Sequence, residues 1–154
     1  SWFCALITFG EGYHNFHHTF PADYRNGLKW YHFDPSTWII WTGNLFGLTS
    51  NLKRTEAPVR WRKRHDRQLE VYLDLLAETL PEVHGEWKVR VESASQRVEE
   101  TLTQWAQQLR EYRRAVKNGE VTESLRQAVS EAQKAWYHSW KEFMALRNAL
   151  PLPA

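Results

Sequence analysis

The chain has 154 residues, enough for one domain of ordinary size, and its 25% charged and 42% hydrophobic residues give an average composition typical of a soluble protein. The single cysteine, Cys4, excludes an internal disulfide framework and a C-x-x-C zinc site. The formal net charge of +2 hides a segregated pattern, because residues 53–67 carry seven Lys or Arg side chains against two acids.

A short apolar segment, residues 2–9, is the first predicted element. It falls well short of the roughly 20 residues that a membrane-spanning helix needs. It also lacks the basic leading segment and the small-residue cleavage site of a signal peptide. Since residue 1 is Ser and the only methionine is Met144, we expect this segment to end a transmembrane helix that begins upstream. A short buried strand or helix of a soluble domain is the alternative.

Three of the seven histidines follow within five positions, as His14, His17 and His18. Gly12 and Pro21 bound this cluster, so we expect a brief helical turn set between loops. On such a turn the three imidazoles would fall within an arc of about 100°. Because neutral imidazole is the commonest metal-binding side chain, the cluster predicts a metal site. A polar, partly solvated cluster without metal is the alternative.

The histidine cluster belongs to a longer pattern that covers about the first third of the chain. The pattern comprises residues 10–21 (GEGYHNFHHTFP), 23–27 (DYRNG), 30–35 (WYHFDP), 38–41 (WIIW), 47–48 (GL) and 51–54 (NLKR). It resembles the third histidine box of membrane fatty acid desaturases and the sequence that follows it, most closely in the acyl-CoA delta-9 (stearoyl-CoA) type.

The resemblance implies an integral membrane enzyme that uses two irons and O2 to insert a cis double bond, at delta-9, in a saturated acyl chain. His14, His17 and His18 would be iron ligands, with Glu11 and Asn15 as near neighbours. The substrate would be a fatty acyl-CoA or an acyl-lipid. Electrons would come from an external donor such as cytochrome b5 or ferredoxin, because the chain has no haem, flavin or iron–sulfur motif. No catalytic group beyond the ligands, and no residue binding an organic cofactor, is assigned.

The resemblance also implies two further histidine boxes, which this chain lacks. Its remaining histidines stand alone in the sequence: His32, His65, His84 and His138. An iron site needs several ligands per metal, and one segment offers three imidazoles. We therefore expect the chain to be the C-terminal part of a desaturase, inactive alone and binding divalent metals weakly and without selectivity.

A helix start is predicted at Pro35, and an apolar run follows it. The run comprises Trp38, Ile39, Trp41, Leu45, Phe46 and Leu48. This segment is too short and too broken to cross a bilayer. With its tryptophans and the basic stretch that follows, it suits an interfacial helix, the alternative being a core helix of a soluble protein.

The basic stretch centres on residues 60–64 (RWRKR). Its charge suits attraction to an anionic membrane surface, worth roughly 1 kcal/mol per basic residue, or a solvated helix face. Trp61 adds a stacking side chain of the kind that nucleic-acid-binding proteins use, but no base-reading motif accompanies it, so we expect no nucleic-acid partner. Next to a desaturase-like segment we favour the membrane surface, which places this side in the cytoplasm.

Helical spacing dominates the rest of the chain. Leu69, Tyr72, Leu76 and Leu80 recur every three or four residues, and we expect Pro81 to close that helix and Gly85 to mark the next turn. A coiled-coil-like stripe then comprises Trp87, Val91, Ala94, Val98, Leu102, Trp105, Leu109, Tyr112 and Val116.

Asn118 and Gly119 break this stripe, with Gly119 suited to a helix C-cap. A second stripe comprises Val121, Leu125, Ala128, Ala132, Trp136, Trp140 and Phe143, and Thr122 can cap its helix. The short connection predicts an antiparallel helical hairpin.

The sequence thus predicts an all-α chain with three regions: the C-terminal part of a desaturase domain (1–55), a basic helix or linker (56–82) and a coiled-coil-like hairpin (83–150). The hairpin is expected to be a cytosolic appendage that packs on itself, on the basic helix or on another protomer. Three other functions remain open. They are another membrane histidine-box di-iron lipid oxidase such as a hydroxylase, a soluble di-iron bundle built on Glu11 and His14, and a non-catalytic helical interaction domain.

Overall fold

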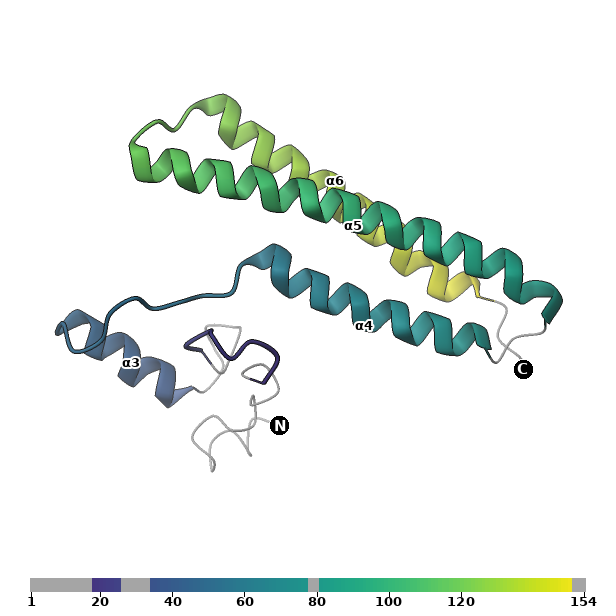
Figure 1. Ribbon diagram of the computed structural model, residues 1–154, viewed down its shortest axis with the longest axis horizontal. Helices are drawn as coiled ribbons and strands as arrows, with labels where there is room; N and C mark the ends of the chain where they lie inside the picture. The colour runs from purple at the N-terminus through teal and green to yellow at the C-terminus, as the bar shows by residue number, and fades with distance from the viewer. Residues whose placement is uncertain (1–17, 26–33, 78–80, 151–154) are drawn as a thin grey trace. The chain divides into compact units, whose positions relative to one another are not determined.

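The computed structural model describes residues 18–25, 34–77 and 81–150, and every regular element within them is helical. The helices are α3 (Pro35–Leu45), α4 (Ala57–Ala77), α5 (Pro81–Asn118) and α6 (Glu123–Ala149) (Figure 1). None of the helices in these ranges is both long and apolar enough to cross a membrane. The transmembrane end expected at residues 2–9 lies outside the described residues. The chain divides into two compact units, Ser1–Glu56 and Ala57–Ala154.

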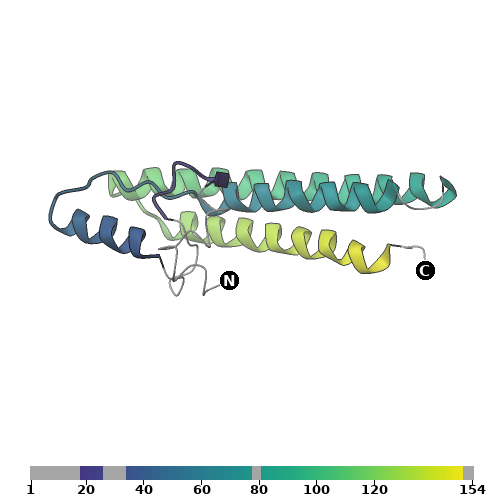
Figure 2. The ribbon, with the colours of Figure 1, turned by 90° about the horizontal axis from the view of Figure 1, so that it is seen from below.

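In the second unit, α5 and α6 form an antiparallel pair, and they lie side by side in both views (Figures 1 and 2). The turn between them begins at Gly119, whose φ of 74° suits glycine because it has no Cβ. The amides of Gly119 and Glu120 donate to the carbonyl oxygens of Val116 and Ala115, which caps α5. Thr122 then caps α6 by accepting a hydrogen bond from the amide of Leu125 at 3.3 Å. Both caps confirm the sequence prediction.

Most buried hydrophobic residues of the hairpin follow the predicted apolar stripes. They are Val91, Ala94, Val98, Leu102 and Trp105 on α5, and Trp136, Trp140 and Phe143 on α6. The stripe on α5 departs from the prediction at its end, where Ala115 is 8% exposed and Val116 is 52% exposed. At this end of α5 the inward-facing position is therefore one residue earlier than the stripe predicts.

Helix α4 completes this unit by packing along α5 and placing its rings against α6. The indole of Trp61 lies 4.7 Å from that of Trp136, and the ring of Tyr72 lies 4.8 Å from that of Phe143, measured between centroids. The Tyr72 hydroxyl donates to the backbone carbonyls of Phe143 and Met144 at 3.2 and 3.3 Å. Burial raises the pKa of Tyr72, which keeps the phenol protonated and able to donate.

Helix α4 ends at Ala77, before Pro81 as expected, but the turn expected at Gly85 was wrong. Helix α5 begins at Pro81 and runs through Gly85. Proline is well suited to a first helical turn, because the amide it lacks would have no partner there. A single glycine inside a helix costs about 1 kcal/mol relative to alanine, which a helix of 38 residues tolerates.

In the first unit, α3 begins at Pro35 as the sequence predicts. Asp34 caps it: its carboxylate accepts from the Thr37 amide at 3.0 Å and from the Thr37 hydroxyl at 2.6 Å. The helix ends at Leu45, and the chain then folds back so that the Thr49 hydroxyl donates to the Ile40 carbonyl at 2.9 Å. This return limits the helix to 11 residues.

Replacement of Tyr72 by Phe should lower the free energy of unfolding of the helical unit by about 1 kcal/mol, because one buried hydroxyl loses its acceptors on α6. Tyr137→Phe is the matched control, since that side chain is exposed on the same unit. Urea unfolding followed by circular dichroism measures both. Equal effects of the two substitutions would show that the Tyr72 hydroxyl does not join α4 to α6.

Candidate functional site

Of the three predicted iron ligands, the structure describes His18 alone. Its side chain is exposed and its backbone is helical, as is that of Thr19. His14 and His17 lie outside the described residues, and so do the neighbours Glu11 and Asn15. The assignment of the three histidines to a metal site therefore stays a prediction.

The segment that follows His18 is anchored by a buried carboxylate, that of Asp23. One oxygen accepts from the amide and Nε of Arg25 at 3.2 and 2.9 Å, and the other accepts from Nη2 of Arg25 at 2.8 Å. This second oxygen also accepts from the Thr55 amide at 2.7 Å. Beside it, the Tyr24 amide donates to the Lys53 carbonyl at 3.2 Å. Residues 23–25 are thereby held against residues 53–55.

These contacts keep Asp23 ionised although it is buried. Burial by itself would raise the pKa of the carboxyl group, but the hydrogen bonds from Arg25 and Thr55 outweigh it and lower the pKa to about 2. The next residues along the two segments also form a polar contact, because the Arg54 guanidinium donates to the Tyr24 hydroxyl at 2.7 Å. Charged and hydrogen-bonded groups thus fix the chain on the C-terminal side of the histidine cluster.

Helix α3, which lies between these two anchored segments in sequence, has no buried residue. Large apolar side chains cover it and the turn after it, and Ile39 and Phe46 are 71% and 76% exposed. A shallow hollow of about 420 Å³ lies among Pro35, Trp38, Ile39, Thr42, Gly43, Phe46 and Leu48. No Lys, Arg, Asp or Glu occurs between Asp34 and Lys53. This surface has the chemistry of an apolar contact.

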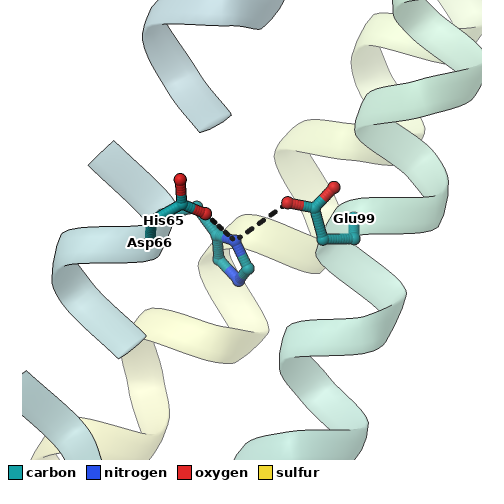
Figure 3. A group of neighbouring side chains, drawn as sticks. All are labelled: His65, Asp66 and Glu99. Atoms are coloured by element: carbon teal, nitrogen blue, oxygen red, sulfur yellow. Dashed lines mark ion pairs between the residues drawn. The ribbon is translucent and has the colours of Figure 1, made fainter. Parts of the chain in front are cut away.

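A second group of metal-ligand type lies in the helical unit, where His65 and Asp66 of α4 meet Glu99 of α5 (Figure 3). The His65 ring is buried, and its Nδ1 points to both carboxylates, at 3.6 Å from Glu99 and 3.9 Å from Asp66. Both distances exceed those of a hydrogen bond, so Nδ1 has no hydrogen-bond partner. Three potential ligand atoms therefore converge within 4.8 Å of one another.

The other ring nitrogen of His65, Nε2, lies 3.1 Å from the buried Ser95 hydroxyl. Burial lowers the pKa of His65 below its usual value, against the attraction of Glu99 and Asp66, so the ring is neutral at neutral pH. The imidazole ring also packs against the ring of Phe143 on α6, at 5.1 Å between centroids. The aromatic core and Ser95 thus fix the orientation of the imidazole.

Sequence reasoning left His65 as an isolated histidine. One signal could have drawn attention to it: His65 precedes Leu69 by four residues and Tyr72 by seven, so it continues the apolar stripe of α4. A histidine on such a stripe is buried and needs polar partners. Its partner Glu99 lies on another helix, and no local spacing in the sequence indicates that contact.

Comparisons with known proteins support the resemblance to acyl-CoA desaturases. The chain is 57% identical over 54 residues to acyl-CoA desaturase 1 of Saccharomyces cerevisiae, which covers 35% of this chain and 11% of the relative. It is 44% identical over 55 residues to stearoyl-CoA desaturase 5 of Homo sapiens, covering 36% and 17%. It is 45% identical over 51 residues to icosanoyl-CoA 5-desaturase of Limnanthes douglasii, covering 33% and 14%.

About a third of this chain is homologous to acyl-CoA desaturases of the delta-9, or stearoyl-CoA, type. The matched length agrees with the sequence pattern, residues 10–54, that carries the resemblance. The matches span 11% to 17% of the length of these three desaturases. No protein-family model matches the chain, and no solved structure matches it.

Replacement of Asp23 by Asn should accelerate hydrogen exchange at the Thr55 amide about tenfold, because the charge that holds this amide and Arg25 is lost. In the unmodified chain the same protection should persist above about pH 4 and be lost as the pH falls toward 2, through the lowered pKa of Asp23. Hydrogen exchange read by NMR, corrected for intrinsic rates, measures both effects.

Asp74→Asn, at an exposed position of α4, is the matched control and should leave the Thr55 amide unchanged. Unaltered exchange at Thr55 in the Asp23 variant would show that the carboxylate does not hold residues 53–55.

Proposed function

We propose that this chain is part of a di-iron acyl-CoA desaturase, which inserts a cis double bond in a saturated fatty acyl chain with O2 and electrons from an external donor. The observation that carries this proposal is the 57% identity over 54 residues to an acyl-CoA desaturase. An identity of this level over so long a stretch is far more specific than a three-histidine pattern alone.

The histidine cluster is the part of this chain that would hold iron. Neutral imidazole suits iron, and the helical backbone at His18 is compatible with the turn that would gather His14 and His17 on one side. Bound iron would supply the oxidising power to break unactivated C–H bonds. The protein's contribution would be to hold each imidazole neutral and oriented, and the Asp23 anchor would fix the segment that leads out of the cluster.

Three imidazoles cannot complete the ligand sets of two irons, each of which needs several ligands. The remaining ligands would come from segments that this chain does not contain, which agrees with matches spanning 11% to 17% of the relatives. The chain alone should therefore lack desaturase activity. Its metal binding at the histidine cluster should be weak and unselective.

Substrate placement, and not the iron ligands, would decide the position of the double bond. Relatives named for delta-9 and for delta-5 desaturation both match this chain. Two of these relatives, named for delta-9 and for delta-5, are 44% and 45% identical to this chain, so delta-9 stays the position that the sequence resemblance implies. A hydroxylase with the same histidine box is the nearest alternative, because its oxidant is similar and its product differs.

We further propose that α3 lies in the interface of a membrane. The exposed apolar surface of α3 and its lack of charged residues support this location. The basic residues that follow, beginning with Lys53 and Arg54, would lie near anionic lipid head groups on the cytoplasmic side. An apolar helix of 11 residues would lie in the interface and not span the bilayer.

In the complete protein that contains this chain, His17→Ala or His18→Ala should lower desaturation of stearoyl-CoA by more than about 100-fold and reduce the bound iron. The helical unit should stay folded, because its core contains neither residue. Gas chromatography with mass spectrometry of the acyl products, together with iron analysis, measures both effects. It also separates unsaturated from hydroxylated products.

His138→Ala is the control, since His138 is an exposed histidine paired with Glu142 on α6. It should retain full activity and iron content. Desaturation that persists in the His17 variant would show that His17 is not an iron ligand. Hydroxylated products from the unmodified protein would show that the enzyme is a hydroxylase and not a desaturase.

Binding of the full chain to vesicles containing phosphatidylserine should weaken about tenfold or more when Ile39 and Phe46 are both replaced by Ala. Each substitution removes an exposed apolar side chain worth roughly 1.5–3 kcal/mol when buried. Val116→Ala, at an exposed position on α5, should leave vesicle binding unchanged. Cosedimentation with the vesicles measures binding, and equal affinity of all three proteins would exclude α3 as the membrane contact.

A further inference from the structure

We propose that His65, Asp66 and Glu99 form a binding site for one divalent transition-metal ion of the Zn²⁺ type, between α4 and α5. This site is independent of the histidine cluster and of the desaturase function. It would take one imidazole nitrogen and two carboxylate oxygens from the protein and complete its coordination with water.

The first support is the direction of the buried imidazole. Nδ1 of His65 has no hydrogen-bond partner, and the nearest polar atoms are oxygens of Glu99 and Asp66 at 3.6 and 3.9 Å (Figure 3). A buried polar atom without a partner costs free energy, so its retention on an apolar stripe calls for a ligand. When Nε2 carries the ring proton, Nδ1 presents a lone pair beside two anionic oxygens, and a cation between them satisfies all three.

The second support is that the imidazole is already held in place. The Ser95 hydroxyl oxygen lies 3.1 Å from Nε2 and can accept a hydrogen bond from the Nε2–H group, as a partner of the second ring nitrogen does in metal sites. Arg62 donates to Oε2 of Glu99 at 3.1 Å, which leaves Oε1 toward the imidazole. Phe143 packs on the ring from α6. The imidazole is therefore fixed before any ion binds.

The distances fit an ion after a small movement of the two acids. Zn²⁺ binds imidazole nitrogen at about 2.0–2.1 Å and carboxylate oxygen at about 2.0–2.2 Å, which places tetrahedral ligand atoms roughly 3.4 Å apart. The three atoms here lie within 4.8 Å of one another. The side chains of Asp66 and Glu99 are 50% and 38% exposed, so they can move inward while solvent ions and water reach the site.

An ion at this place would join α4 to α5 at the level of the aromatic core. Zn²⁺ fits better than Mg²⁺ or Ca²⁺, which prefer oxygen ligands alone. Because the ion would bind the folded unit and not the unfolded chain, its binding would stabilise the unit. At a large excess of Zn²⁺ over its dissociation constant, the midpoint of thermal unfolding should rise by about 5 °C or more.

The test uses the full chain with His14, His17 and His18 all replaced by Ala, so that the histidine cluster cannot bind the ion. Calorimetric titration with Zn²⁺ should give one site per chain. Glu99→Gln and Asp66→Asn, each added to this background, should weaken it at least about tenfold. Both variants keep the size of the side chain, and circular dichroism verifies that the helices persist.

Glu142→Gln is the matched control, because Glu142 pairs with the exposed His138 at 3.2 Å in a similar histidine–carboxylate contact on α6. It should leave both the affinity and the thermal shift unchanged. Absence of Zn²⁺ binding in the background chain would overturn the proposal. So would an affinity that neither the Glu99 nor the Asp66 substitution changes, or a loss of the same size in the Glu142 variant.

Discussion

The helical unit depends on the aromatic contact between α4 and α6. Helices α5 and α6 can pair through their own apolar stripes, whereas α4 packs along α5 and meets α6 through aromatic rings. Trp61 packs on Trp136 and Tyr72 packs on Phe143, with the Tyr72 hydroxyl bonded to the α6 backbone. Phe143 also packs against the His65 ring, so the group formed by His65, Asp66 and Glu99 exists only where α4 is docked. The packing of α4 on α6 and the geometry around His65 therefore depend on each other.

In the first unit, a single buried charge joins separate segments of the chain. The carboxylate of Asp23 joins two segments that are separated in sequence by all of α3, because it accepts hydrogen bonds from both Arg25 and Thr55. Burying a carboxylate is unfavourable unless it is paired and hydrogen-bonded, and here both conditions hold. The helix between the two segments has no buried residue, and its large apolar side chains lie at the surface.

Local features of this structure could be predicted from the sequence, and contacts between helices could not. The apolar spacing located the buried faces of α5 and α6, and Gly119 and Thr122 marked the caps, because each of these depends on neighbours within a few residues. Helix α4 ends before Pro81 as expected, but the turn placed at Gly85 was wrong, because proline is also compatible with a helix start and α5 begins at Pro81. Contact between His65 and Glu99 depends on how α4 docks on α5, which no spacing within either helix determines.

The predicted metal site at the histidine cluster shows how little a short motif alone can say about function. The spacing of His14, His17 and His18 indicates metal binding, but the identity of the metal and the reaction came from the longer resemblance. That resemblance is supported over about a third of the chain. The rest includes the helical unit, whose function has to be argued from its own residues.

The basic residues 60–64 show that a count of charges in the sequence does not predict how much charge is exposed for a partner. Arg62 is paired with Glu99 at 3.1 Å, and the Arg64 guanidinium lies 4.9 Å from the centroid of the Trp61 ring. Trp61 itself packs against Trp136, so it is no open platform for a nucleic-acid base. Part of the positive charge is thus used within the helical unit. Attraction to an anionic membrane would depend more on exposed cations such as Lys63.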